Sequence, residues 1–240
     1  MICQTYDLGT LEYQSAWDMQ NRLATEISEG KRPASLLLLE HPPVYTFGRQ
    51  GQAQNLLWNP QQLEKTGISV HWVDRGGDVT YHGPGQLVGY PLLKLAGMDH
   101  VGYVRNLEVM LIQALARLGL VSGQISGKTG VWVQADVASR CPRCSPKDRL
   151  KPAKIAAIGV KVDANGITRH GFALNVDPDM TFFEGIIPCG ISEYPVVSLA
   201  DIFPVPPGMT RVKQAVRQAF GEVFNFEIIE TSFDFLSYNQ

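Results

Sequence analysis

Two residues of this 240-residue chain have both the type and the setting for covalent chemistry, Cys189 and Lys154. Cys189 stands between Pro188 and Gly190, so we expect it on a turn with its sulfur open to approach. A cysteine becomes a nucleophile when a nearby cation or helix N-terminus favours its thiolate. Lys154 opens the apolar run at residues 155–159 and, if partly buried, supplies that cation. The ordinary alternatives are a buried structural cysteine and a solvated lysine at a strand end.

A glycine-rich segment at residues 75–86 is the second feature that suggests chemistry. It holds four glycines, with Arg75, Tyr81 and His82 between them. Glycine lets the backbone approach a ligand closely, and successive N–H groups form a nest for an anion or a carbonyl oxygen. A long turn after a strand at residues 68–73 is an equally good interpretation. The segment matches neither the P-loop pattern nor the dinucleotide-binding glycine spacing.

Cys141 and Cys144 form a single C-x-x-C motif in a polar stretch. A structural zinc site usually needs a second pair of ligands, and the sequence offers none at a suitable spacing. A thioredoxin-like motif would lie at a strand-to-helix junction, whereas this one lies in an expected loop. We therefore favour neither a metal nor a redox role, and the role of this loop stays open.

The spacing of apolar residues predicts the elements that must position these side chains. Helices are expected at residues 13–27, with Thr10 as the cap, and at residues 104–118 and 210–224. Strands are expected where apolar runs are short or alternate, at residues 34–39, 44–47, 68–73, 87–93, 130–134, 154–162 and 167–176.

Asn165 and Gly166 form the dipeptide most favoured in tight hairpin turns, so the strands around them should pair antiparallel. That register would place residues 170–173 across from Ile158 and Gly159, as one wall of a pocket. Helices and strands are interspersed without a regular βαβ order, which predicts an α+β (mixed α/β) fold with one central sheet. Residues 1–240 are expected to form a single domain, with residues 135–152 as an exposed loop.

Composition narrows the class of protein. Hydrophobic residues make up 45% of the chain and charged residues 18%, which excludes disorder. A net charge of −2 provides no global field for nucleic acid or an anionic membrane. We see no secretory signal and no apolar run near the ~20 residues of a membrane span. Four cysteines are too few for a disulfide scaffold, so we expect a soluble, cytoplasmic protein.

Five segments, in their order and spacing, closely resemble the lipoyl(octanoyl) transferases of the biotin/lipoate protein ligase-like superfamily. They are RGGDVTYHGPGQLVGYP at residues 75–91, KTGVWV at 128–133, KIAAIGVK at 154–161, HGFALNV at 170–176 and PCGI at 188–191. The resemblance spans most of the chain. It implies a central mixed sheet flanked by helices and an acyltransferase that performs the first step of endogenous protein lipoylation.

The resemblance also implies roles for individual residues. Cys189 would form an octanoyl thioester, and Lys154 would favour its thiolate and carry the proton. Three segments would line the acyl pocket, and they comprise Arg75, Gly76, Gly77, Asp78, Val79, Thr80, Tyr81, His82, Ala157, Ile158, Gly159, Gly171, Phe172 and Ala173.

The implied reaction moves an octanoyl group from octanoyl-acyl carrier protein, which holds it on phosphopantetheine, to a lysine of a lipoyl domain. The acceptors would be the acyltransferase subunits of 2-oxoacid dehydrogenases and the glycine cleavage H protein. A thioester is already activated, so no ATP, metal or other cofactor is expected. Neither nucleic acid nor a membrane is an expected partner, and we expect a monomer.

Two departures from the family pattern and two alternatives stay open. The loop at residues 135–151 is longer and more polar than the usual connection, and Asn165-Gly166-Ile167 stands where a tryptophan often precedes HG. An ATP-dependent lipoate or biotin ligase of the same fold would not need Cys189. A non-enzymatic binding module would instead hold a metal at Cys141 and Cys144.

Overall fold

The computed structural model describes residues 1–95, 97, 99–190 and 193–233, without the side chain of Cys189. The helices are α1 (Tyr13–Ser28), α2 (Pro60–Thr66), α3 (His100–Arg117), α4 (Ala135–Ala138), α5 (Leu199–Ile202) and α6 (Met209–Phe224). The strands are β1 (Ile2–Thr10), β2 (Ala34–Glu40), β3 (Val44–Phe47), β4 (Ser69–Trp72), β5 (Val79–His82), β6 (Gln86–Leu92), β7 (Gly123–Ile125), β8 (Lys128–Val133), β9 (Ala153–Val162), β10 (Thr168–Asn175) and β11 (Glu227–Glu230).

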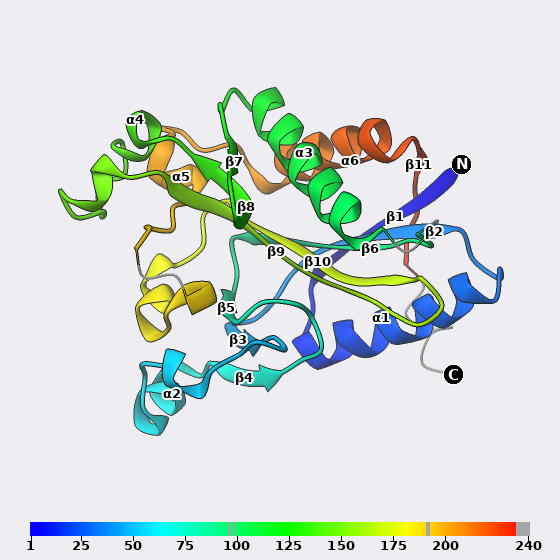
Figure 1. Cartoon of the computed structure of the whole chain (residues 1–240), viewed down its shortest axis with the longest axis horizontal. Coiled ribbons are helices and arrows are strands. Elements are labelled where there is room, and N and C mark those ends of the chain that lie inside the picture. The colour runs from blue at the N-terminus through cyan, green and yellow to red at the C-terminus, as the bar shows by residue number, and fades with distance from the viewer. Residues whose placement is uncertain (96, 98, 191–192, 234–240) are drawn as a thin grey trace.

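A large mixed sheet forms the centre of the fold (Figure 1). Within the described residues its strand order is β11-β1-β2-β6-β10-β9-β8-β7. The pairs at the β11-β1-β2 edge are parallel, and all the other pairs are antiparallel. The predicted mixed sheet with flanking helices is therefore confirmed.

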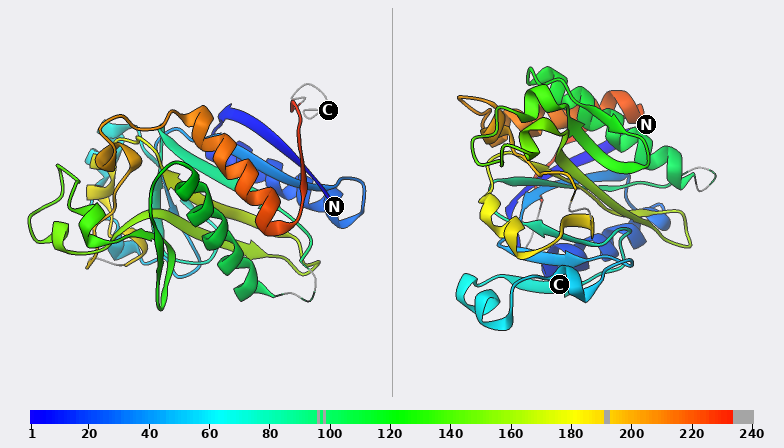
Figure 2. Two further views of the ribbon diagram at one scale, coloured as in Figure 1. Left: turned by 90° about the horizontal axis from the view of Figure 1, so that it is seen from above. Right: turned by 60° about the vertical axis from the view of Figure 1, so that its left-hand side comes forward.

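Helices cover both faces of this sheet. Helices α3 and α6 lie side by side on one face, while α1 covers the opposite face (Figures 1 and 2). The apolar residues of β2 pack on both faces of the sheet. Leu36 and Leu38 join the core under α3 and α6, whereas Leu37 and Leu39 join the core under α1. A strand buried on both faces reads as a continuous apolar run, which is the pattern seen here.

A second, smaller sheet of order β4-β3-β5 was not predicted. Its strand β5 shows that Val79–His82 is regular structure, so the interpretation of residues 75–86 as one long turn is wrong at this point. The reason is burial, since Val79 and Tyr81 pack with Tyr45 and Phe47 in a separate apolar cluster. Glycines lie on both sides of this strand and indicate a turn, so its four alternating apolar and polar residues do not stand out as a strand in the sequence.

The caps and first residues of two helices differ from those that the spacing of apolar residues predicts. Thr10 does not cap α1, because it is the last residue of β1 and Glu12 occupies the N-cap position. Helix α3 begins earlier than expected, at His100, where the Asp99 carboxylate accepts a hydrogen bond from Gly102 N at 2.9 Å. Polar capping residues extend a helix beyond its apolar stripe.

The connection between β8 and β9, called here the 135–152 loop, is only partly the exposed loop expected. It begins with the short helix α4 and later forms a 3₁₀ turn at Asp148–Leu150. Cys141 is completely buried, although most of its neighbours are exposed. Among the described residues, no helix is long and apolar enough to cross a membrane.

Candidate active site

The β9-β10 hairpin has the predicted register. Gly171 pairs with Gly159, Phe172 with Ile158 and Ala173 with Ala157. Gly171 also permits close contact with β6, because a Cβ atom there would lie 2.1 Å from the Gly89 carbonyl oxygen. The small residues Gly159, Gly171, Ala157 and Ala173 leave space above the sheet that larger side chains would fill.

A narrow pocket lies between this hairpin, α1 and the segment before β5. The space free of atoms within it and at its open mouth is about 450 Å³, of which about 40 Å³ is open to the centre of a water molecule. Its walls include Val88, Ala157, Ile158, Phe172 and Ala173, and its polar residues include Tyr13, Arg75, His82, Tyr90 and His170. The shape and the largely apolar walls suit a slender apolar group.

Most of the proposed acyl-pocket residues meet at this pocket. The ones that line it are Arg75, Gly76, Gly77, Thr80, His82, Ala157, Ile158, Gly159, Gly171, Phe172 and Ala173. Asp78, Val79 and Tyr81 lie outside its lining; Val79 and Tyr81 belong to the core of the small sheet instead.

The pocket lining also includes residues that the sequence did not single out for binding. They are Tyr13, Val88 and Tyr90, whereas His170 belongs to the wall that the hairpin register predicted. Tyr13 was interpreted only as the start of an apolar helix face. Val88 and Tyr90 lie within the glycine-rich family motif, which was the one available signal for them.

A chain of hydrogen bonds holds the polar side of the pocket. Arg75 Nη2 donates to Thr46 Oγ1 at 2.9 Å, and Thr46 Oγ1 lies 3.4 Å from His82 Nε2. His82 Nδ1 lies 2.7 Å from Gln86 Oε1, while Gln86 Nε2 donates to Asn175 Oδ1 at 2.8 Å. Since Gln86 presents its oxygen to His82, Nδ1 carries the proton and Nε2 accepts from Thr46.

Burial keeps two histidines near the pocket neutral. It lowers the pKa of His82 to about 3, with a further contribution from the nearby His41. It lowers the pKa of His41 to about 4, although the Leu11 carbonyl favours the protonated form. Taking a charged imidazolium out of water is costly, so both rings stay uncharged near neutral pH.

His170 occupies an unusual position at the end of the pocket. Its backbone has a φ of 56°, and its Nε2 lies 2.8 Å from Asp74 Oδ1. The hydrogen bond from His170 is the main cause that holds the pKa of Asp74 well below its usual range. Burial lowers the pKa of His170, against the opposing effect of Asp74.

Lys154 lies near the start of β9 and is buried, so it is not the solvated strand-end lysine of the alternative interpretation. Its Nζ lies 4.8 Å from the centre of the Trp132 ring, a cation–π contact with the ammonium group. Gly130 lets β8 approach β9 closely, because a Cβ there would lie 2.7 Å from the Ala156 carbonyl oxygen. Trp132 of the KTGVWV motif therefore helps to hold the Lys154 side chain in place.

Lys154 and Pro188 line a second cavity that adjoins the pocket. This cavity encloses about 280 Å³ and shares Thr80, Ala157 and Ala173 with the first. Cys189 follows Pro188 in the 3₁₀ turn η5 (Pro188–Gly190). The side chain of Cys189 and residue Ile191 lie outside the described part of the structure, so the Lys154–Cys189 dyad stays a prediction.

Asp78 supports the turn that carries Cys189. Its carboxylate accepts hydrogen bonds from the Asn55 side-chain amide and from Gln52 N, the latter at 3.0 Å. The Asn55 carbonyl in turn accepts from Ile187 N at 2.9 Å. Asp78 therefore holds the neighbouring backbone rather than lining the pocket.

The other three cysteines have different environments. Burial raises the pKa of the Cys3 thiol to about 12, so it does not form a thiolate near neutral pH. Cys141 and Cys144 form a disulfide. Within the described ranges, no group of three or more His, Cys, Asp or Glu side chains is arranged to hold a metal ion.

The fold and the site are those of a mixed α/β domain with a narrow, largely apolar pocket. Residues 12–221 match the lipoyl protein ligase A/B catalytic domain, and the chain belongs to this family. It is 46% identical over 222 residues to an octanoyltransferase of Chloroflexus aurantiacus, covering 92% of this chain and 93% of that one. It is 48% identical over 193 residues to an octanoyltransferase of Salinispora tropica, covering 80% and 82%. The predicted enzyme class, an acyltransferase, is confirmed.

Solved structures of similar shape support the fold. A lipoate-protein ligase A bound with ATP has a TM-score of 0.73 at 16% identity, covering 100% of this chain and 92% of that chain. A bipartite lipoate protein ligase from Thermoplasma acidophilum has a TM-score of 0.71 at 16% identity, covering 100% and 90%. At this identity the likeness concerns the fold alone.

Proposed function

We propose that this enzyme transfers an octanoyl group from an acyl carrier protein, through a thioester on Cys189, to a lysine of a lipoyl domain. The observation that carries the proposal is the meeting of Lys154 and Pro188 beside a narrow apolar pocket, in a chain closely similar to octanoyltransferases. The acceptors are the lipoyl domains of 2-oxoacid dehydrogenase complexes and the glycine cleavage H protein.

In the first half-reaction the Cys189 thiolate attacks the carbonyl carbon of the carrier thioester. The tetrahedral intermediate collapses, the bond to the carrier sulfur breaks, and the octanoyl group stays on Cys189. The ammonium of Lys154 favours the attacking thiolate and protonates the departing carrier thiolate. Backbone N–H groups of the turn around Cys189 stabilise the oxyanion.

In the second half-reaction the amine of the acceptor lysine attacks the octanoyl-Cys189 carbonyl. Lys154, now neutral, accepts the proton that the amine loses, and Cys189 leaves as a thiolate. An amide bond forms as the thioester bond breaks, which is downhill and requires no nucleotide. No ATP, metal or other cofactor takes part in the proposed reaction, and the proposed enzyme acts as a monomer in the cytoplasm.

The pocket dimensions support a linear acyl chain as the substrate. Only about 40 Å³ is open to the centre of a water molecule, and Ala157 and Ala173 mark where the two cavities join. An acyl chain bound to Cys189 would pass Lys154 and Thr80 in the second cavity before it reaches the first pocket. A fused-ring substrate would need the walls to separate.

Mass spectrometry after incubation with octanoyl-carrier protein tests this function. We expect one octanoyl adduct on Cys189 that disappears when an apo lipoyl domain is added. Cys189→Ala should abolish both the adduct and the product, whereas Cys3→Ala, a matched change at a buried cysteine, should retain both. Turnover from free octanoate plus ATP by Cys189→Ala would instead identify an ATP-dependent ligase.

A further inference from the structure

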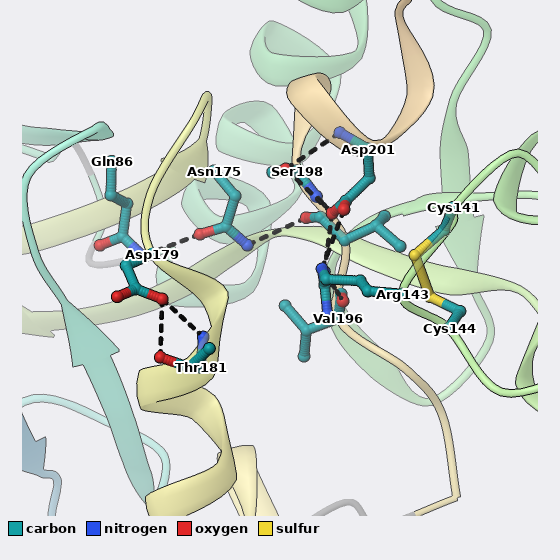
Figure 3. A network of polar contacts seen from close by, with 11 residues as sticks. Gln86, Cys141, Arg143, Cys144, Asn175, Asp179, Thr181, Val196, Ser198 and Asp201 are labelled. Carbon is teal, nitrogen blue, oxygen red and sulfur yellow. Dashed lines mark hydrogen bonds and ion pairs between the residues drawn. A yellow bond between two sulfur atoms is a disulfide. The ribbon is translucent and has the colours of Figure 1, made fainter.

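The 135–152 loop carries a cysteine pair that the proposed reaction leaves unused. Cys141 and Cys144 form a disulfide, with 5.5 Å between their Cα atoms. Cys141 is completely buried, whereas Cys144 is 8% exposed and lines a wide groove that also includes Pro188. Figure 3 shows the bond between the two sulfur atoms, and Cys144 lines the same groove as Pro188, the residue before Cys189.

Arg143, between the two cysteines in sequence, ties this loop to the rest of the site. Its Nε and Nη2 donate to the two carboxylate oxygens of Asp201 at 2.8 and 2.7 Å. Nη2 also donates to the carbonyl oxygen of Val196 at 2.7 Å (Figure 3). Bidentate binding of a carboxylate fixes both the position and the direction of a guanidinium group.

Residues 195–197, called here the strap, lie directly beside Lys154. Lys154 N donates to the Pro195 carbonyl at 2.9 Å, and Val197 N donates to the Lys154 carbonyl at 2.9 Å. Asn175 Nδ2 donates to the Val197 carbonyl at 3.1 Å. Arg143 thus binds the middle carbonyl of a strap whose two neighbouring residues both bind the Lys154 backbone.

The disulfide determines how firmly Arg143 is held. Pro142, Arg143 and Ser145 are exposed, so packing fixes this turn only at the buried residues Cys141 and Cys144. A covalent link between Cys141 and Cys144 removes conformational freedom that Arg143 would otherwise lose when it binds Asp201. Opening the disulfide should therefore weaken the contact between Arg143 and the strap.

We propose that Cys141 and Cys144 are a thiol–disulfide exchange site, and that Arg143 is the positioning residue through which this pair acts on Lys154. The oxidised pair is the state competent for acyl transfer. The role assigned to Lys154 rests on the function proposed above, whereas the exchange site itself rests on the disulfide and its place in the groove.

Exchange uses a dithiol as the reductant. Its thiolate attacks Sγ of Cys144, forms a mixed disulfide and releases Cys141 as a thiolate, which takes up a proton. The second thiol of the reductant then attacks the reductant's first sulfur, which is bonded to Cys144 in the mixed disulfide. Cys144 leaves as a thiolate and is protonated. Two electrons and two protons pass to the pair, and the dithiol becomes a disulfide.

The test equilibrates the full-length protein in mixtures of reduced and oxidised dithiothreitol. Alkylation and mass spectrometry measure the oxidised fraction of the pair, and steady-state kinetics measure kcat and KM on the same samples. On reduction we expect kcat to fall about tenfold with KM for the acyl carrier unchanged, since a misplaced catalytic group slows chemistry rather than binding. The fall in kcat should follow the oxidised fraction.

Three variants assign the effect to residues. Arg143→Gln should have the low kcat of the reduced enzyme at every redox ratio. Arg140→Gln, which removes the same charge from an exposed position in the same loop, should behave as wild type. The Cys141→Ser/Cys144→Ser double variant should stay in the slow state throughout, which separates the effect from oxidation of Cys189.

Hydrogen exchange gives a readout that needs no activity. The amides of Lys154 and Val197 should exchange faster after reduction or in Arg143→Gln. If neither redox state forms octanoyl-Cys189 while these amides still follow the pair, the proposed function fails and the exchange site stands. An unchanged kcat after reduction, a redox response that persists in Arg143→Gln, or a pair that stays reduced at every ratio would each overturn the inference.

Discussion

The narrow pocket and the wide groove that Cys144 and Pro188 line are built in different ways. The pocket leaves about 40 Å³ open to the centre of a water molecule, and the groove leaves about 840 Å³. The pocket walls come mainly from α1, the paired strands β5, β6, β9 and β10 and the segment before β5. The 135–152 loop forms part of the groove wall. Arg143 ties it to Asp201 through two hydrogen bonds of one ion pair, and the disulfide closes a turn within the loop.

This difference indicates how each region should respond to change. In the pocket, most side chains are held by strands whose backbone hydrogen bonds and packed core resist displacement. In the loop, single side chains hold exposed backbone, so the loop can change while the sheet stays folded. Substitutions in the pocket should therefore affect rate or global stability, and substitutions in the loop should act locally.

The largest effect is expected for Lys154→Ala. Loss of a group that carries a proton slows a reaction by about 10²- to 10⁴-fold, so octanoyl-Cys189 should form that much more slowly. Lys151→Ala is the matched control, because Lys151 lies in the loop and pairs with Asp148 at 3.4 Å. Stopped-flow acylation of both variants measures the effect, and equal rates would remove Lys154 from the mechanism.

Acidification should destabilise the protein through the two buried histidines His82 and His41. Their buried pKa values, about 3 for His82 and about 4 for His41, lie below the ordinary value of about 6.5. Below about pH 6.5 the unfolded chain binds protons that the folded chain does not, so stability is full above that pH and falls as pH decreases toward the folded values.

By this linkage, each histidine should contribute a loss of roughly 2 kcal/mol between about pH 6.5 and pH 5. Urea unfolding at a series of pH values measures it. His82→Asn should show a shallower loss than wild type, whereas His100→Asn, at an exposed position, should not. A wild-type stability that stays constant down to pH 5 would contradict buried, neutral histidines.

The same contrast explains what the sequence could predict. Asn165 and Gly166 determine a turn, the turn determines the register of β9 and β10, and the register brings Gly171 opposite Gly159. Alternation and turn chemistry are local, so this wall of the pocket was predictable. Tyr13 reaches the pocket only because α1 packs across the sheet, and no local pattern carries that information.

The loop was beyond prediction for a related reason. Arg143 contacts Asp201 and Val196, more than 50 residues away in sequence. The C-x-x-C spacing carries no information about these distant contacts or about the burial of Cys141. The sequence also assigned Asp78 to the pocket, whereas its hydrogen bonds to Gln52 and Asn55 show that it supports neighbouring backbone.

Gly171→Ala should lower global stability, because the new Cβ would lie 2.1 Å from the Gly89 carbonyl oxygen in β6. Overpacking of this kind costs about 1–3 kcal/mol, which lowers Tm by roughly 2–4 °C for each kcal/mol in a chain of this size. Gly123→Ala is the matched control at the edge of the same sheet, where a Cβ would meet nothing within 4 Å. Equal Tm values for the two variants would show that β6 and β10 adjust easily.

The smallest global effect is expected for Arg149→Gln in the loop. Arg149 donates to the Cys144 carbonyl at 3.0 Å and to the Pro142 carbonyl at 2.7 Å, so it holds the turn of the disulfide without contacting the sheet. Its loss should change the free energy of global unfolding by no more than about 0.5 kcal/mol, because surface hydrogen bonds exchange readily with water.

The local effect of the same change should be much larger than the global one. The loop amides of Arg143, Cys144, Ser145 and Lys147 should exchange faster and the loop should become more sensitive to protease, since local opening no longer breaks the two carbonyl contacts. Lys147→Gln, at an exposed position in the same loop, is the control for lost charge. A fall in Tm as large as that of Gly171→Ala would show that the loop and the sheet unfold together, because only a loop coupled to the core can transmit the loss of a surface contact to it.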